Sequence, residues 1–247
     1  MRFGSLFAGI GGIDLGLERA GMTCSWQVDN DEFCQKVLTK HWPDVPKYRD
    51  IRDVGKENLE TVDLIAGGFP CQSVSLAGKG LGNDDTRWLW DDFYRVICEI
   101  RPKWVLVENV PGLYSAKNGM LFGGILRDLA LVGYDAEWQM LSAATVGAPH
   151  IRERVFILAY SQGLRCGGVN GFFDDWQAKR EVNASNNPIG FEGKELSKRW
   201  KGKPQMGGVV YGVSANMDSI RGLGNAVIPQ VAEFIGRIIM EANEMEL

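Results

Sequence analysis

A cysteine in a proline-containing loop and an acid at the end of a predicted strand are the side chains best suited to chemistry. Cys71 lies in the sequence GGFPCQS, directly after the apolar run Val62–Ala66. Its thiol could act as a nucleophile, although a lone cysteine is more often an inert core residue. Glu108 follows another apolar run, Lys103–Val107. Because the carboxyl ends of neighbouring parallel strands meet at one edge of a sheet, we expect Glu108 and Cys71 in the same crevice.

Two arginines enter a further predicted strand. The sequence His150-Ile151-Arg152-Glu153-Arg154 leads into the apolar run Arg154–Tyr160. Residues two apart in an extended chain share a face, so Arg152 and Arg154 are expected to point the same way. The alternative interpretation is a surface ion pair between these arginines and Glu153.

A glycine turn and an acidic cluster suggest a nucleoside cofactor. The turn Phe7–Gly12 lies between a predicted strand, Arg2–Phe7, and a predicted helix, Ile13–Ala20, which Gly21 would end. Glycines there allow close approach of a ligand to the backbone. About twenty residues on, the cluster Asp29-Asn30-Asp31 follows the apolar run Thr23–Val28, where a carboxylate can accept hydrogen bonds from ribose hydroxyls. Asn30 or Asp29 could instead cap the next helix.

The elements that must position these residues alternate between strands and helices. Further helices are predicted by the sequence patterns, and they are Asp31–Lys40, Arg87–Ile100, Gly119–Leu131 and Ala226–Glu241. This alternation predicts an α/β fold with a mostly parallel, twisted sheet and helices on both faces. The segment from Ser161 to Val213 lacks sustained periodicity, which predicts a functional insertion or disorder.

Composition limits the class of protein. The 247 residues are 45% hydrophobic and 23% charged, which is typical of globular chains. No run approaches the roughly 18 apolar residues of a membrane span. Five cysteines without a CxxC pair suit free thiols in a reducing cytosol, and two histidines argue against a His-rich zinc site. We therefore expect a cytoplasmic protein that uses neither membrane nor metal.

Positive charge is concentrated in the irregular segment. The net charge of the whole chain is −4, yet five basic residues lie within Lys194–Lys203. Such a cluster is either a solvated surface loop or a patch that contacts phosphates.

Taken together, these motifs resemble those of the DNA (cytosine-5) methyltransferases. The resemblance covers nearly the whole chain and keeps the family's order: the glycine turn, GFPCQS at Gly68–Ser73, ENV at Glu108–Val110, the two arginines, and Gly224–Gln230. It implies a Rossmann-like class I methyltransferase fold with a small irregular target-recognition insertion. Residues 1–160 would form the catalytic and cofactor-binding domain, 161–213 the recognition region, and 214–247 a segment returning to the catalytic domain.

The resemblance also implies a mechanism. Cys71 would add to carbon 6 of a flipped-out cytosine, and a protonated Glu108 would hydrogen-bond the ring nitrogen. Arg154 would contact the cytosine carbonyl oxygen, with Arg152 near the nucleophile. The methyl donor would be S-adenosyl-L-methionine. Its binding is assigned to Phe7, Ala8, Gly9, Ile10, Gly11, Gly12, Asp29, Asn30, Asp50, Ile51, Gly68, Pro70, Asn225 and Val227. Substrate binding is assigned to Phe69, Gln72, Ser73, Lys79 and Asn109.

Some positions depart from the family pattern, and some alternatives stay open. Asp29 stands where the family usually has Glu, and His150 where Gln is common. Double-stranded DNA is the implied partner, a cognate restriction endonuclease is compatible with the resemblance, and a monomer is expected. The alternatives are a tRNA cytosine-5 methyltransferase, a non-catalytic DNA-binding protein on the same fold, and a nicotinamide dehydrogenase, which would not explain the Pro-Cys loop.

Overall fold

The computed structural model describes residues 1–70, 88–148, 151–162 and 226–244. They form one sheet in the order β3-β2-β1-β4-β5-β7-β6. Its strands are β1 (Arg2–Leu6), β2 (Thr23–Val28), β3 (Lys47–Tyr48), β4 (Leu64–Gly67), β5 (Trp104–Asn109), β6 (Tyr134–Ser142) and β7 (Glu153–Ser161). β1 to β5 pair in parallel, whereas β7 pairs antiparallel with both β5 and β6. The predicted α/β fold with a mostly parallel sheet is confirmed.

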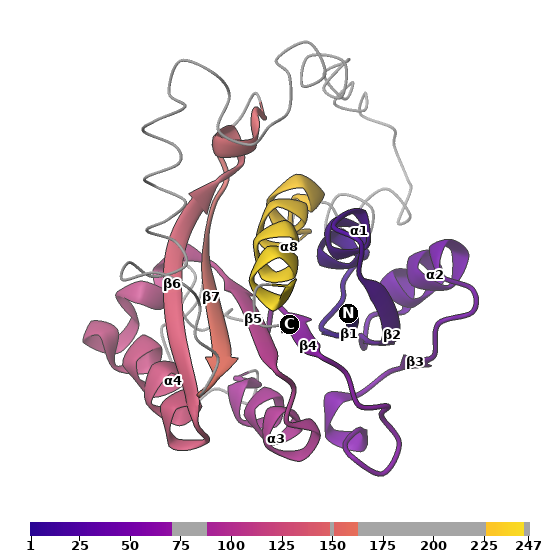
Figure 1. The fold of residues 1–247 in the computed structure, drawn as a ribbon, viewed down its shortest axis with the longest axis horizontal. Coiled ribbons are helices and arrows are strands. Elements are labelled where there is room, and N and C mark those ends of the chain that lie inside the picture. The colour runs from indigo at the N-terminus through magenta and orange to yellow at the C-terminus, as the bar shows by residue number, and fades with distance from the viewer. Residues whose placement is uncertain (71–87, 149–150, 163–225, 245–247) are drawn as a thin grey trace, which may run out of the picture.

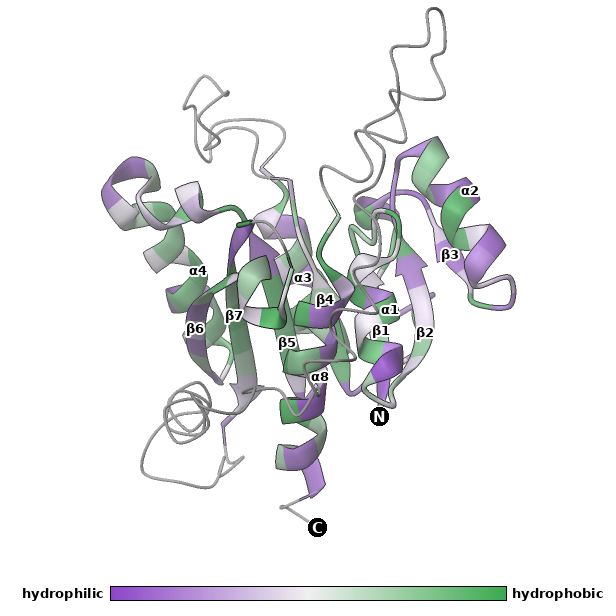
Figure 2. Cartoon of the chain, turned by 90° about the horizontal axis from the view of Figure 1, so that it is seen from above, coloured by the Kyte–Doolittle hydropathy of each residue, from purple (hydrophilic) through white to green (hydrophobic). Residues whose placement is uncertain are grey.

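Helices cover both faces of the sheet (Figure 1). The α-helices are α1 (Gly12–Arg19), α2 (Glu32–His41), α3 (Trp90–Ile100), α4 (Met120–Leu131) and α8 (Pro229–Glu244), and short 3-10 helices are η1 (Ile51–Asp53), η3 (Pro111–Tyr114), η4 (Ala116–Gly119) and η5 (Ala143–Val146). α3 and α4 share one buried core with the sheet, and α1 and α8 share a second. In Figure 2, α4 and α8 carry both hydrophobic and hydrophilic patches, as expected for helices with one buried side. No helix among these residues is long and apolar enough to cross a membrane.

α1 and α8 lie side by side although more than 200 residues separate them in the chain. Two glycines allow this. A Cβ at Gly12 would come within 2.3 Å of the Val227 carbonyl oxygen, and one at Gly16 within 2.5 Å of the Ala232 Cβ. Any larger residue at either position would push the helices apart, so the glycines at the start of α1 also serve helix packing.

The chain reverses direction across the sheet between β1 and β4. From β1 it runs outward through β2 and β3, then returns to place β4 on the other side of β1. Such a switch point leaves a crevice at the carboxyl ends of the two strands, where open α/β sheets bind ligands. The Phe7–Gly12 turn follows β1 and the sequence Gly68-Phe69-Pro70 follows β4, so two of the predicted motifs flank this crevice.

Several boundaries and two strands differ from expectation. The sequence patterns miss β3, which has only two residues, and β6, an edge strand whose sequence YDAEWQMLS mixes acidic and apolar residues. The helix predicted from Ala226 begins at Pro229. α2 is capped by Asp31, which accepts a hydrogen bond from the Cys34 amide at 3.0 Å, and not by Asn30 or Asp29. Gly21 does follow α1 with a positive φ of 96°, as predicted.

Candidate active site

Glu108 lies at the carboxyl end of β5 and is 7% exposed. The Nε atom of Arg154, at the start of β7, forms an ion pair with Glu108 Oε1 at 3.0 Å. Burial raises the pKa of Glu108 to about 7, and the charges of Arg154 and Arg152 oppose that rise. The carboxyl group can therefore hold a proton near neutral pH, which is the form expected to hydrogen-bond the ring nitrogen of the base.

Arg152 and Arg154 lie on the same side of the chain, as predicted. Both act electrostatically on Glu108. Arg154 donates a hydrogen bond to the backbone carbonyl oxygen of Glu153 at 2.7 Å. Its ion pair is with Glu108 and not with the Glu153 side chain, as the alternative interpretation would have it. Arg152 donates to the carbonyl oxygen of Ala226 at 2.8 Å, which ties the arginine to the segment before α8. The guanidinium groups thus border the site from the β7 side.

The start of the Pro-Cys loop lies directly against Glu108. A Cβ at Gly68 would come within 2.5 Å of Glu108 Oε2, so only glycine leaves room for the carboxyl group here. Asn109 donates to the Phe69 carbonyl oxygen at 3.2 Å and accepts from the Val110 amide at 2.9 Å. These contacts fix the backbone of Gly68–Pro70 beside the acid. Cys71 is the next residue in the sequence and lies outside the described residues.

Two residues predicted to bind substrate, Phe69 and Asn109, are buried at the start of the loop. Phe69 is 3% exposed, and its ring packs against Trp88, Trp90 and Phe93 at centroid distances of 5.2 to 6.4 Å. Asn109 is 3% exposed and bonded to the backbone. Both therefore anchor the start of the loop, and their contact with substrate stays a prediction. Gln72, Ser73 and Lys79 lie outside the described residues.

The glycine turn is joined to the end of β2. Asp29 Oδ2 accepts a hydrogen bond from the Gly9 amide at 2.7 Å, and its Oδ1 accepts one from the Asp31 amide at 2.9 Å. Burial raises the pKa of Asp29, and these two amides oppose the rise. Each carboxylate oxygen can accept a further hydrogen bond. The acid therefore shapes the turn and keeps acceptor capacity on both oxygens.

Phe7 adopts a positive φ of 54°, which is rare for a bulky residue. Its half-buried ring stacks on Phe93 at 6.3 Å, and it packs against the same core as Ile51. Asp50 accepts a hydrogen bond from the backbone amide of Arg52, at the N-terminus of η1, and Ile51 is 3% exposed. Phe7 and Asp50–Ile51 thus follow the carboxyl ends of β1 and β3, on either side of β2, and Asn30, which follows β2, is exposed.

A cavity of about 1160 Å³ opens beside the turn, bordered among others by Gly11, Gly12, Val227, Arg152 and Arg154. Pockets for small ligands usually measure about 300–1,000 Å³. The cavity is thus large enough for a small ligand, but Phe7, Asp29, Ile51 and Glu108 are not among the residues that border it. Asn225, assigned to the cofactor, lies outside the described residues. No cluster of metal-ligating side chains occurs among the described residues.

Comparisons with known proteins decide the family. A profile of the C-5 cytosine-specific DNA methylases matches residues 1–189. This chain belongs to that family. The methylase match takes in the glycine turn, Cys71, Glu108 and both arginines, so the resemblance noted in the motifs is confirmed.

Individual relatives agree with the methylase family. The chain is 37% identical to the Type II methyltransferase M.HgiCII of Herpetosiphon aurantiacus over 165 residues, which is 66% of this chain and 38% of that protein. It is 34% identical to the Type II methyltransferase M.NgoBI of Neisseria gonorrhoeae over 64% of this chain and 50% of the relative. The matched region of this methylase thus spans half or less of the length of these curated relatives.

Solved structures support the methylase fold. A crystal structure described as a DNA modification methyltransferase encoded within a prophage of E. coli superposes with a TM-score of 0.70 over 99% of both chains, at 20% identity. The methyltransferase EhMeth of Entamoeba histolytica gives a TM-score of 0.64 at 15% identity, over 100% of this chain and 98% of the other. At such identities the likeness shows the fold alone.

Proposed function

We propose that this chain transfers a methyl group from S-adenosyl-L-methionine to carbon 5 of cytosine in duplex DNA. The observation that carries the proposal is the buried Glu108, whose pKa is raised to about 7, paired with Arg154 and held against the start of the Pro-Cys loop. Glu108 can hold a proton near neutral pH, and Arg154 provides a cation beside it. Together they suit recognition of the edge of cytosine, which carries both hydrogen-bond acceptors and a donor.

The described residues fit the cofactor. Asp29, held by the Gly9 amide, provides a carboxylate at the carboxyl end of β2, beside the glycine turn. When bound, S-adenosyl-L-methionine would supply an electrophilic methyl group. Phe7 and Ile51 would enclose the adenine, and Asp29 would accept hydrogen bonds from the ribose.

The steps at the base follow from the side chains. The Cys71 thiolate adds to carbon 6, and Glu108, protonated, donates to ring nitrogen 3 so that carbon 5 becomes electron-rich. Arg154 donates to the carbonyl oxygen of the base. Once carbon 5 holds the methyl group and S-adenosylhomocysteine has been released as leaving group, the carbon 5 proton leaves to a base. The bond from sulfur to carbon 6 then breaks, ring nitrogen 3 returns its proton to Glu108, and the Cys71 thiolate is restored. The target must be flipped out of the duplex because the crevice cannot reach a stacked base.

The remaining assignments complete the proposal. Residues 1–160 and 214–247 would form the catalytic body, and residues 161–213, with the basic cluster Lys194–Lys203, would read the DNA and contact its phosphates. A cognate restriction endonuclease would act on the same sequence in the cytoplasm, and the methyltransferase would work as a monomer.

The test uses methyl-labelled S-adenosyl-L-methionine with duplex DNA and with tRNA, each with the wild type and Cys71→Ala. We expect label at carbon 5 of cytosine in DNA and none with the variant. Transfer to tRNA alone would overturn the substrate assignment. With duplexes that contain 5-fluorocytosine, a covalent protein–DNA adduct should accumulate only when cofactor and Cys71 are both present, because fluorine cannot leave as a proton does.

A further inference from the structure

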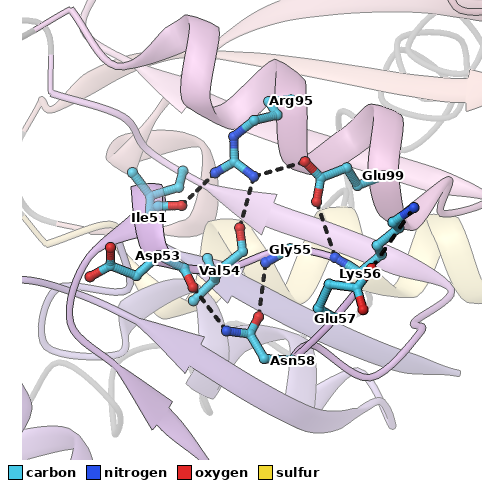
Figure 3. Close-up of polar contacts among 9 residues, drawn as sticks. All are labelled: Ile51, Asp53, Val54, Gly55, Lys56, Glu57, Asn58, Arg95 and Glu99. Atoms are coloured by element: carbon cyan, nitrogen blue, oxygen red, sulfur yellow. Dashed lines mark hydrogen bonds and ion pairs between the residues drawn. The ribbon is translucent and has the colours of Figure 1, made fainter.

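An arginine on α3 holds the segment that follows β3. Arg95 donates through one terminal nitrogen to the Ile51 carbonyl oxygen at 2.7 Å, and through the other to the Val54 carbonyl oxygen at 2.9 Å and to Glu99 Oε1 at 2.9 Å (Figure 3). Ile51 and Val54 are each 3% exposed. One planar guanidinium group therefore joins two buried points of the segment to the helix.

Glu99 completes this attachment one turn further along α3. Its Oε2 accepts a hydrogen bond from the Lys56 amide at 3.1 Å. A Cβ at Gly55 would lie only 2.0 Å from the same oxygen, so the carboxyl group fits against the bare backbone of a glycine. The pair lowers the pKa of Glu99, chiefly through the hydrogen bond from Arg95, which keeps the acid charged.

Asn58 braces the segment from within. Its side chain donates to the Asp53 carbonyl oxygen at 2.8 Å and accepts from the Gly55 amide at 2.9 Å (Figure 3). Its own carbonyl oxygen accepts from the Tyr48 hydroxyl, on β3, at 2.7 Å. The segment 51–58 is thus folded on itself and fixed at both ends, yet it contains only three residues of 3-10 helix.

We propose that Arg95 and Glu99 are positioning residues that hold the segment 51–58 in the conformation that binds the adenine end of the cofactor. The inference rests on the proposed function, since Asp50 and Ile51 are the residues assigned to that end. Arg95 acts through Ile51 and touches no ligand itself. Without the pair, the segment would have to be ordered by the cofactor, and the entropy lost on binding would weaken affinity.

The helix α3 also contacts two other segments at the crevice. Phe93, two residues before Arg95, stacks on Phe7 and packs edge-on against Phe69. α3 therefore carries the contacts of three segments at the crevice: the glycine turn, the start of the Pro-Cys loop and the segment 51–58. A change at Arg95 should nevertheless act on cofactor affinity, because its hydrogen bonds reach only the last of these.

The experiment titrates S-adenosylhomocysteine, the product form of the cofactor, into the full chain by calorimetry. Arg95→Met should bind about tenfold more weakly than the wild type, with a less favourable entropy, and Arg95→Lys should fall between them. At saturating cofactor the rate of methyl transfer should stay within about twofold of the wild type, while KM for the cofactor rises in step with the dissociation constant. The matched control is Lys36→Met, which breaks the exposed i,i+4 pair with Glu32 on α2 and should change neither value.

Each outcome separates the two proposals. If the wild type does not bind S-adenosylhomocysteine, the proposed function fails. If the wild type binds and a folded Arg95→Met binds equally well, or loses rate at unchanged affinity, the positioning role is wrong. Should Arg95→Met not fold, Glu99→Gln decides the question: it keeps the shape of the side chain, and we expect about threefold weaker binding and faster hydrogen exchange of the amides in 51–58.

Discussion

The backbone of Gly68 lies so close to the carboxyl group of Glu108 that a single methyl group would not fit between them. The distance from an added Cβ to Glu108 Oε2 would be 2.5 Å. Gly68 precedes Cys71 by three residues, so the loop that carries the proposed nucleophile and the acid that would hold the base are placed by one contact.

Gly68→Ala should displace the Glu108 carboxyl group or the loop. We expect the rate of methyl transfer to fall by about 100-fold, because misplacement by about 1 Å can cost that much. Gly123→Ala is the control, since an added Cβ there meets nothing within 4 Å. An active Gly68→Ala enzyme would mean that the acid has room to move.

The raised pKa of Glu108 predicts the pH dependence of the reaction. Its carboxyl group is protonated below about pH 7 and ionised above, so kcat/KM for DNA should decline on the alkaline side with a midpoint near pH 7. Glu108→Gln, which cannot ionise, should be about 100-fold or more slower and should lack this decline. A decline that persists in the variant would belong to another group.

Asn109→Ala tests the anchoring of the loop. Removing the amide leaves the Phe69 carbonyl oxygen without this donor, so we expect about tenfold slower methyl transfer at unchanged cofactor affinity. Asn243→Ala is the matched control: its side chain accepts from Lys103 Nζ at 2.7 Å, before the amino end of β5 and far along the strand from Asn109. Equal effects of the two variants would show that only general stability is involved.

Asp14 should make stability depend on pH. It is fully buried behind the glycine turn, where it accepts hydrogen bonds from Gln27 at 2.7 Å and Ser5 at 3.0 Å, and burial raises its pKa from 3.8 to about 6. Between these values the folded chain binds more protons than the unfolded chain. The Asp14 contribution to the free energy of unfolding should therefore fall as the pH rises from about 4 to 6 and then level off, while Glu108, whose pKa is raised to about 7, adds a fall that continues to about pH 7.

Denaturant titrations between pH 4 and 7 measure this slope. Asp14→Asn should remove the Asp14 part of the slope and leave the part that belongs to Glu108, whereas Asp135→Asn, a change at an exposed residue of β6, should leave the whole slope in place. A slope of the same size in Asp14→Asn would assign it elsewhere.

The sequence predicts those parts of the molecule in which local pattern and fold agree. Buried strands such as Thr23–Val28 and the positive φ of Gly21 follow from hydrophobic runs and glycine punctuation, and the motif order places Glu108 at the right sheet edge. β6 escapes prediction because an edge strand buries little, and Trp138 and Met140 on it remain 39% and 47% exposed.

The sequence also does not predict contacts between segments that lie far apart in the chain. Nothing in the local sequence distinguishes a substrate-binding Phe69 or Asn109 from residues that anchor a loop, since both roles place a conspicuous side chain beside a motif. Arg95 lies 44 residues from Ile51 in the sequence, and the hydrophobic pattern of its helix indicates only that the position is partly exposed. The sequence likewise does not predict that Gly55 packs against the carboxyl group of Glu99, because the two residues are brought together only by the fold.

The pairing of α1 with α8 has a consequence for how such a chain can diversify. Both ends of the described chain contribute to a single body, because α1 and α8 share one buried core. If residues 161–213 read the DNA as proposed, exchanging them between relatives should change which sequences are modified while the catalytic body is kept.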